Sequence, residues 1–414
     1  MTTHATDLTA RPVPAEGQVT DITSSPGPFV VVHSLTTLVG VSLNRDMNDL
    51  PKTLRYGGID RMRVSSQSLV RAAREYMRTD GSHDRSDAVS TRSLPHAVAR
   101  HLETEYDVDL ADAMPAAALI VAATGLSISP ADPGRTKVMT YVPADSAQQL
   151  SRLVMSHWNE LADPRERMDE IIADALTTET AGRGAPSGRK TQAVSPAMDL
   201  SEPLVTAAQA ALEPGAVEEI ALFGRMLAGL PRSRVFSAAH VAHGFSVDPL
   251  HRITDEFTAG DDYQDGGVFA DAGMLGRQYL VSGTLYRQAS LDRRQLRLNL
   301  AFSGKTDDGV EALAQSAERR WTRAIVRSLP SAKRSRTGSP PRPTLAVIAA
   351  SDEALTAGPA FEDAITSQPA GTHAAARLAA YLHHLDLRGG TALWQSPTGD
   401  TPPGLPGVLT VKGY

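Results

Sequence analysis

The sequence predicts an α+β fold that follows the split βαβ order of ferredoxin-like domains: strand, helix, strand, strand, helix, strand. Two observations support this prediction. Segments rich in Val, Thr and Leu and two helical patterns follow one another in that order, at 29–41, 65–78, 235–247, 279–288, 307–328 and 344–350. An Ala-rich stretch of helical texture, from about 80 to 234, separates the first helix from the second strand. We therefore expect one α+β core that carries a large helical insertion.

Local patterns predict the first strand and the first helix. Residues 1–27 mix Thr, Ser, Pro, Asp and Gly without periodicity, which is typical of a flexible leader. The strand at 29–41 has few breakers, and a polar loop follows at 44–60. Ser65 is placed to cap the next helix. Apolar residues at helical spacing predict the buried face of that helix, namely Leu69, Ala72, Ala73, Tyr76 and Met77.

The second half of the chain predicts the remaining elements. The strands at 235–247 and 279–288 enclose an excursion at 248–277, which is too long for a tight hairpin and holds seven acidic residues. The helix at 307–328 is expected to bury Val310, Leu313, Ala314, Ala317, Trp321, Ala324 and Ile325. The tail at 397–414 is rich in Pro and Gly and is expected to pack as irregular chain.

Composition excludes several classes of protein. The 414 residues are 41% hydrophobic and 21% charged. At about 150 residues per domain, this length corresponds to roughly 2.8 domain-sized units. The absence of cysteine excludes disulfide scaffolds, thiolate metal sites and thiol nucleophiles, and it fits a reducing compartment. The N-terminal segment lacks the apolar core of a signal peptide, and no apolar stretch approaches the roughly 18 residues of a membrane span. We expect a cytoplasmic protein without membrane contact.

Two basic segments occur in a chain whose formal net charge is −6. Residues 52–78 hold seven basic and two acidic residues, and residues 318–342 hold eight basic residues and one acidic residue. Such segments can line one groove for a polyanion, although two solvated helix faces explain the charge equally well. The predicted element order is also that of RRM domains, whose sheet binds single-stranded RNA. The RNP1 aromatic signature is absent, so base stacking across the sheet is not expected.

Several motifs, in order along the chain, resemble those of one family. The first comprises Leu43-Asn44-Arg45-Asp46, Tyr56-Gly57-Gly58 and Arg61-Met62-Arg63-Val64-Ser65-Ser66-Gln67-Ser68-Leu69. Later motifs are Ala221-Leu222-Phe223-Gly224-Arg225-Met226, His240-Val241-Ala242-His243, Phe257-Thr258-Ala259-Gly260-Asp261-Asp262, Leu275-Gly276 with Ser282-Gly283-Thr284-Leu285-Tyr286-Arg287, and Ala332-Lys333. Together they resemble the motifs of the CasC family, which comprises the Cas-seven backbone subunits of type I-E CRISPR Cascade. The resemblance covers about 29–77 and 221–350.

The resemblance implies a hand-shaped protein with an RRM-like palm, a helical fingers insertion and a thumb loop. The implied boundaries are a leader at 1–27, a palm at 28–75, 235–247 and 279–396, fingers at 76–234, a thumb at 248–278 and the Pro/Gly-rich tail at 397–414. Subunits of this family stack along a crRNA, push single bases out of line and leave short segments to pair with target DNA. The implied partners are therefore the crRNA, target DNA through the guide, further copies of the chain and other Cascade subunits. No catalysis, cofactor or metal is implied.

The motifs and the basic segments select candidate RNA contacts: Asn44, Arg45, Lys52, Gly57, Gly58, Arg61, Arg63, Ser65, Ser66, Gln67, Arg71, Arg74, Arg225, Met226, Phe257, Thr258, Lys333 and Arg334. Phosphate contacts suit a protein that holds RNA of any sequence, because phosphates fix the register without reading bases. Polar residues at a helix N-terminus can turn hydroxyls, an amide and backbone N–H groups toward an anion. Exposed Met and Phe side chains can wedge against displaced bases.

Simpler explanations compete for several of these residues. A glycine pair such as Gly57 and Gly58 can let the backbone approach phosphate or can simply form a turn. A lone serine before a helix is an ordinary cap, and a single Phe or Met is usually part of the core. The sequence also departs from the family at Val70, where a lysine is common. Some phosphate contacts must therefore be redistributed or missing.

Two alternative functions remain open on the sequence alone. A metal-dependent ribonuclease of the same fold would use an acid such as Asp46, Asp261 or Asp262, although an Asx turn explains Asp46 more simply. A self-assembling protein that does not bind RNA is the second alternative. His240 and His243 are three residues apart in a predicted strand, so their side chains point to opposite sides and are not expected to bind one metal.

Overall fold

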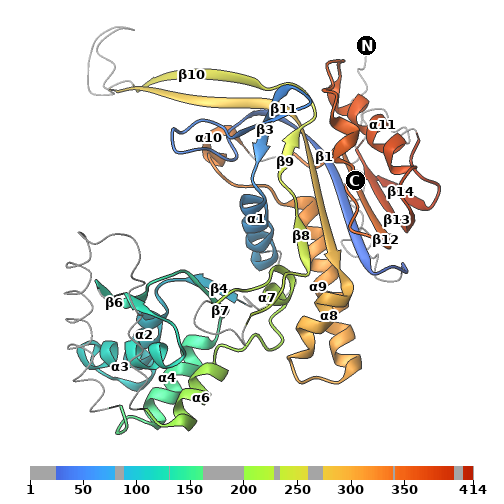
Figure 1. Cartoon of the computed structure of the whole chain (residues 1–414). Coiled ribbons are helices and arrows are strands. Elements are labelled where there is room, and N and C mark those ends of the chain that lie inside the picture. Colours follow the sequence, from blue (N-terminus) through green and yellow to red (C-terminus); the bar gives the residue numbers. More distant parts are fainter. Residues whose placement is uncertain are drawn as a thin grey trace, which may run out of the picture. The chain divides into compact units, whose positions relative to one another are not determined.

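The structure, a computed structural model, describes residues 25–79, 88–129, 131–161, 200–227, 234–259, 274–338, 341–395 and 404–413 (Figure 1). The chain divides into two compact units. The sheet unit comprises Met1–Gly81, Ala239–Arg294 and Gln315–Tyr414, and the helical unit comprises Ser82–Ala238 and Gln295–Ala314. Predictions for most of the leader, for 260–273 and for 397–403 fall outside the described residues. Within the described ranges, no helix is both long and apolar enough to cross a membrane.

A large mixed sheet forms the framework of the sheet unit and confirms the predicted α+β class. Its strands lie in the order β14-β13-β12-β1-β11-β9-β3-β2, and β8 and β10 each pair with β11. The strands are β1 (Phe29–Val41), β2 (Thr53–Tyr56), β3 (Ile59–Val64), β8 (Ala239–Val241), β9 (Gly244–Ser246), β10 (His251–Ala259), β11 (Met274–Asp292), β12 (Leu345–Ser351), β13 (Leu387–Trp394) and β14 (Leu409–Gly413).

Strand β1 is central in this sheet and has the bounds that the sequence predicts. It pairs antiparallel with β11 on one side, where Leu35 lies opposite Tyr286, and with β12 on the other, where Leu35 lies opposite Leu345. Residues from Val30 to Thr36 are buried without alternation. A strand that is covered on both faces needs such a continuous apolar or small-polar run rather than a half-polar one.

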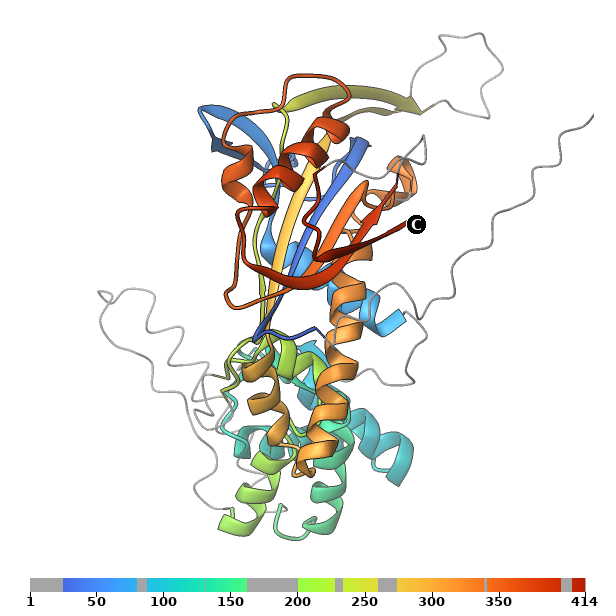
Figure 2. The ribbon, with the colours of Figure 1, turned by 90° about the vertical axis from the view of Figure 1, so that its right-hand side faces the viewer.

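Helices cover both faces of the sheet. Helix α11 (Ala370–Leu382) packs on the face that carries Val31 and Leu35 (Figure 2). The opposite face meets α9 (Asp307–Arg327), because Arg287 of β11 donates hydrogen bonds to the carbonyl oxygens at the end of that helix. Helix α11 therefore covers part of this face, over β1 and β11.

Two helices on the same face are tied together. Arg320 of α9 donates from Nη2 to the carbonyl oxygen of Met77, near the end of α1 (Ser66–Thr79), at 3.0 Å. The buried residues of α1 are those predicted, except that Tyr76 is only half-buried. In α9, Trp321 is fully buried as expected, whereas Val310 and Leu313 are half-buried. Helices α8 (Arg293–Ala301) and α10 (Arg334–Thr337) flank α9 in sequence, and α8 was not predicted.

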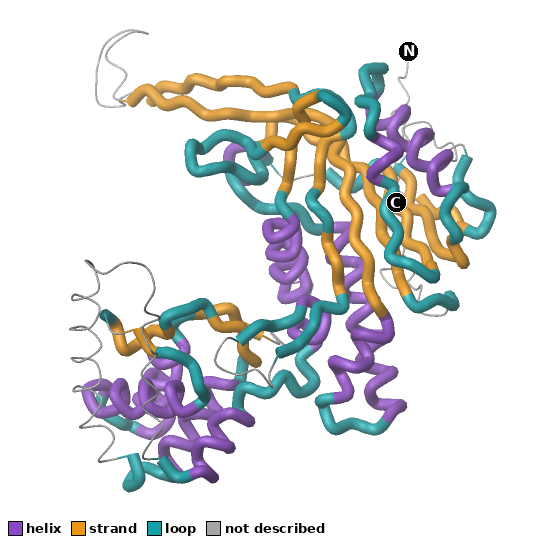
Figure 3. Tube along the Cα trace, viewed as in Figure 1, coloured by secondary structure: helices purple, strands orange, loops and turns teal. Residues whose placement is uncertain are grey.

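The excursion predicted at 248–277 contains a long antiparallel ribbon. Strand β10 pairs with the first half of β11 from His251 opposite Ser282 to Ala259 opposite Met274. Figure 3 shows this pair extending beyond the rest of the sheet. The acidic, Thr-bearing sequence of β10 has no buried face to produce an apolar alternation, and its strand character is therefore missing from the sequence pattern.

The helical unit has its own core. Leu102, Ile120, Leu150 and Leu204 are fully buried and come from four different helices. The helices are α2 (Leu94–Tyr106), α3 (Leu110–Ala123), α4 (Ser146–Ser156), α6 (Glu202–Ala210) and α7 (Glu218–Phe223), and the strands are β4 (Ala88–Thr91), β5 (Ile128–Ser129), β6 (Asp132–Thr136) and β7 (Thr140–Pro143). The strands form two two-stranded sheets, β4 with β7 and β5 with β6.

Three local predictions were wrong. The loop predicted at 44–60 contains the hairpin of β2 and β3, whose turn residues Gly57 and Gly58 have φ of 58° and 74°. Positive φ at both positions is the signature of a tight hairpin turn. The strand predicted at 235–247 is broken into β8 and β9. The tail is not all irregular, because β14 pairs in parallel with β13.

Candidate nucleic-acid interface

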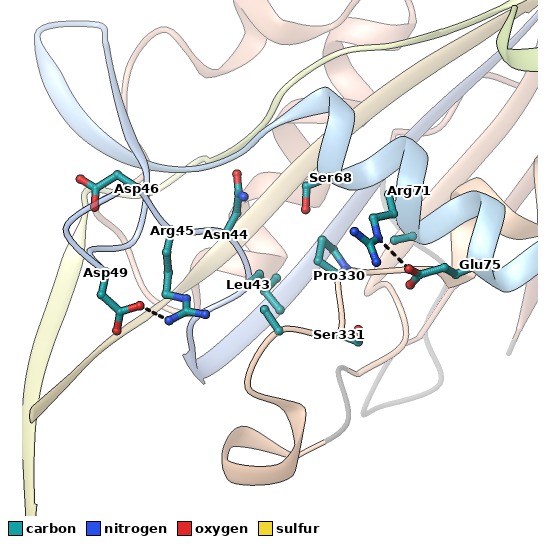
Figure 4. A pocket seen from close by; sticks show the side chains of 12 residues that line it. Leu43, Asn44, Arg45, Asp46, Asp49, Ser68, Arg71, Glu75, Pro330 and Ser331 are labelled. Carbon is teal, nitrogen blue, oxygen red and sulfur yellow. Dashed lines mark hydrogen bonds and ion pairs between the residues drawn. The ribbon is translucent and has the colours of Figure 1, made fainter. Parts of the chain in front are cut away.

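A polar pocket of about 440 Å³ brings together three segments that the sequence singled out (Figure 4). The loop after β1 contributes Leu43–Asp46 and Asp49, helix α1 contributes Ser68, Arg71, Ala72 and Glu75, and the chain after α9 contributes Pro330–Ala332. These segments belong to the two basic stretches at 52–78 and 318–342 or adjoin them. The pocket therefore brings residues in or beside both basic stretches together in the sheet unit.

The start of α1 is fixed by hydrogen bonds to its first turn. Ser65 accepts the N–H of Ser68 on Oγ at 3.3 Å, so it caps the helix as predicted. The side chain of Asn44 accepts the N–H of Ser65 at 3.0 Å and thereby joins the pocket loop to the helix. The N–H of Ser66 donates to Nδ1 of His243 at 2.9 Å. The N–H of Ser66 is therefore already hydrogen-bonded and is not available to an anion. Gln67 is the exposed polar side chain in the first turn of the helix.

The carboxylate of Asp49, on the loop after β1, engages two cations. Asp49 forms ion pairs with Arg45 and with Lys333, whose Nζ lies 3.2 Å away. Although partial burial works against it, the hydrogen bond from Lys333 and the charges of Lys333 and Arg45 lower the pKa of Asp49. Asp49 therefore stays ionised and offsets part of the positive charge that would attract a polyanion. Asp49 carries no signal in the sequence, because its partner Lys333 is distant along the chain.

Asp46 shapes the same loop. Its Oδ1 accepts the N–H groups of Asn48 at 2.8 Å and Leu50 at 3.0 Å. This is the Asx-type arrangement that the sequence suggested as the simpler account. Among the described residues, no group of three or more Asp, Glu, His or Cys side chains is placed to bind a metal ion. Asp261 and Asp262 lie outside the described residues.

The remaining basic candidates of this segment differ in exposure. The Arg71 side chain is 82% exposed and pairs with Glu75 at 2.8 Å. Arg74 is half-buried on the same helix, and Lys52 is half-buried beside the loop. Arg63 of β3 pairs with Phe245 of β9, and its buried Nε makes no hydrogen bond within the described part of the chain. Arg71 is thus the cation most available to a phosphate.

Two arginines chosen from the sequence are buried and serve the fold. Arg61 is fully buried, and its guanidinium donates to the carbonyl oxygens of four residues, Ser246, Val247, Phe361 and Glu362. Arg225 is also buried and donates to Leu212 O at 2.6 Å, and burial lowers the pKa of Arg225 to about 10. Neither guanidinium can reach a phosphate, so these two assignments are corrected.

The glycine pair also has a structural role. A side chain at Gly57 would overlap the carbonyl group of Glu362, so the close approach at this position is to the chain's own backbone. Gly58 has open space around it. The hairpin therefore packs tightly on one side through Gly57, and the expected phosphate contact of Gly57 is corrected.

The other candidates are not among the residues that line the pocket. Met226 is 76% exposed in the helical unit. On β10, Phe257 is half-buried and Thr258 is exposed. The guanidinium of Arg336 lies 5.3 Å from the centre of the Phe257 ring, and Arg334 is exposed at the start of α10. Phe257 is therefore linked to the basic segment after α9, although neither lines the pocket.

Arg287, a residue of the later motifs, positions the segment that leads into the pocket. Arg287 donates to the carbonyl oxygens of Ile325, Val326 and Ser328 and so fixes the end of α9, directly before Pro330. Cations at a helix C-terminus stabilise its unpaired carbonyl groups. The motif residue Arg287 thus has a positioning role that its sequence alone does not reveal.

Comparison with known proteins gives the class of the chain. Residues 30–395 match the model of the CT1975-like protein family, so the chain belongs to that family. It is similar to a chain of a solved CRISPR RNA-guided surveillance complex in a pre-nicking state, with 26% sequence identity and a TM-score of 0.71; the match covers 93% of this chain and 96% of that one. A chain of another CRISPR RNA-guided surveillance complex has the same fold, with 24% identity, a TM-score of 0.62 and coverage of 93% and 95%. No curated protein matches the chain.

Proposed function

We propose that this protein is a non-catalytic backbone subunit of a CRISPR effector complex, which binds crRNA, assembles along it with further copies and presents it for pairing with target DNA in antiviral defence. The observation that carries the proposal is the match over 93% of the chain, at 26% identity, to a chain of an RNA-guided surveillance complex. Further Cascade subunits are the expected partners, and type I-E CasC is the proposed type.

The sheet topology supports an RRM-like palm in this proposal. Four strands lie in the order β12-β1-β11-β9, with α1 between β1 and β9 in sequence and α9 between β11 and β12. A split βαβ unit places its fourth, first, third and second strands in this order. The helical insertion corresponds to the fingers of the proposed hand, and the ribbon of β10 and β11 corresponds to the thumb.

The pocket supports phosphate binding in this role. Arg45, Arg71 and Lys333 converge from three segments around one polar pocket or its rim, and Ser66 and Gln67 begin the helix beside it. Contacts of this kind hold RNA without reading its sequence. The engagement of Asp46 in two backbone hydrogen bonds supports a structural rather than a catalytic carboxylate.

RNA binding by the purified chain tests the proposal directly. A single-stranded RNA should bind with a logarithmic salt slope of about −0.7 for each phosphate neutralised, and it should remain intact in the presence of magnesium. The Arg71→Ala chain should bind more weakly with a shallower slope, whereas Arg323→Ala, also a basic-to-neutral change but away from the pocket lining, should change the affinity less. Cleavage of the RNA that is lost in Asp46→Ala would support the ribonuclease alternative instead.

A further inference from the structure

The ring of Phe257 is held in a defined position between two strands and a basic segment. Phe257 of β10 lies opposite Gly276 of β11, and the ring reaches so far across that a side chain at position 276 would overlap it. The guanidinium of Arg336 lies over the ring, 5.3 Å from its centre. Arginine and an aromatic ring at this distance form a cation–π pair. Phe257 is thus already engaged within the chain.

The segment that supplies Arg336 is tied at its other end to the pocket. We call Lys333–Arg336 the basic strap. Lys333 adopts a left-handed backbone conformation with φ of 55°, and its Nζ forms an ion pair with Asp49 at 3.2 Å. The strap therefore connects the loop after β1 to the ribbon of β10 and β11 through two contacts, one electrostatic and one cation–π.

Building on the proposed function, we propose that the basic strap is an autoinhibitory contact that RNA displaces. In the free chain the Arg336 guanidinium covers a face of the Phe257 ring on which a displaced base would stack. Asp49 forms an ion pair with Lys333. RNA supplies competitors for both contacts, since phosphates attract the two cations and a base takes the ring. Base stacking on an aromatic side chain is stronger than an exposed cation–π pair, so bound RNA can open the strap.

The test measures how the full chain binds a single-stranded oligouridine RNA with one central 2-aminopurine, whose fluorescence falls when the base stacks. Arg336→Lys keeps the charge but loses the planar group that stacks on the ring. We expect this variant to bind about twofold to fivefold more tightly, with an unchanged salt slope and stronger quenching. Arg294→Lys, the same change at an exposed arginine near the start of α8 that is neither a candidate RNA contact nor part of the strap, should leave both quantities unchanged.

A second background separates displacement of the strap from a direct contact. In Phe257→Leu there is no ring to uncover, so adding Arg336→Lys should give no gain in affinity. A weaker Arg336→Lys complex, or a gain in affinity that persists in Phe257→Leu, would contradict the proposal that RNA displaces the strap. If the wild-type chain failed to bind the RNA, the proposed function would be contradicted as well. If it bound and Arg336→Lys had no effect, only the autoinhibitory role of the strap would be contradicted.

Discussion

The Nζ of Lys333 lies 3.2 Å from Oδ2 of Asp49, although the two residues are far apart in sequence. This ion pair joins the segment after α9 to the loop after β1, and Arg45 pairs with the same carboxylate. One exposed carboxylate thus engages two of the cations that we assign to RNA binding. A polyanion must compete with Asp49 for both of them.

Asp49→Asn should therefore strengthen RNA binding. The variant frees Lys333 and Arg45 from a competing charge, and the logarithmic salt slope should steepen by up to about 0.7 for each cation that then meets a phosphate. Filter binding at several salt concentrations measures both effects. Asp112→Asn, which removes an exposed acid from α3 in the helical unit, is the control for net charge. Equal gains in the two variants would show that Asp49 has no specific role.

Arg61→Ala should destabilise the protein without a direct effect on RNA contact. The substitution removes the guanidinium that donates to four carbonyl oxygens, three of them in buried hydrogen bonds, and the free energy of unfolding should fall by about 3 kcal/mol. Thermal unfolding measures this change. Arg71→Ala removes an exposed arginine from the neighbouring helix and should cost less than about 0.5 kcal/mol. Similar losses in the two variants would contradict the buried role of Arg61.

Gly57→Ala should cost more stability than Gly58→Ala. Both positions have positive φ, which costs a residue with a side chain about 1–2 kcal/mol. At position 57 the new methyl group would also overlap the backbone of Glu362, whereas position 58 is open. We expect an additional loss of about 1–3 kcal/mol at position 57, as for overpacking elsewhere. Equal thermal midpoints for the two variants would be incompatible with the packed hairpin.

Acid should weaken the fold through His33. This residue is fully buried in β1, and burial lowers the pKa of His33 from 6.5 to about 4. The unfolded chain therefore binds a proton at a higher pH than the folded chain does. The stability that the neutral ring contributes is complete above pH 6.5 and is lost as the pH falls to about 4, by up to about 3 kcal/mol.

The pH dependence of unfolding for wild type and His33→Asn measures this contribution. The asparagine offers a polar atom near the position of Nδ1, which lies 2.9 Å from the hydroxyl oxygen of Tyr286 in the wild type. His33→Asn should show a flatter profile between pH 6.5 and 4. Identical profiles for the two chains would remove His33 as a source of acid sensitivity.

The elements predicted well from sequence are those whose signal is local. Strand β1 and helix α9 are found within a residue or two because their apolar residues follow one pattern throughout. The hairpin of β2 and β3 was missed, although Tyr56-Gly57-Gly58-Ile59 carries the signal of a two-residue turn. Strand β10 gave no usable signal, since an exposed ribbon needs no apolar face.

The division between surface and buried arginines could not be predicted. Arg61 and Arg71 belong to the same basic segment and differ only in what the fold brings to them. Arg61 meets carbonyl groups from positions 185 to 301 residues away, whereas Arg71 meets Glu75 one turn further along its helix. Partners at such separations are set by the packing of the whole sheet unit rather than by neighbouring residues.

Sequencing and sizing the RNA that co-purifies with the tagged protein tests the central claim most directly. The protein is expressed with its neighbouring genes and a repeat–spacer array. Our account predicts discrete, spacer-containing RNA in the wild-type preparation and its loss from the folded Arg63→Glu, Gln67→Ala double variant. No RNA, RNA of random sequence, or cleaved fragments alone would contradict a subunit that holds a guide.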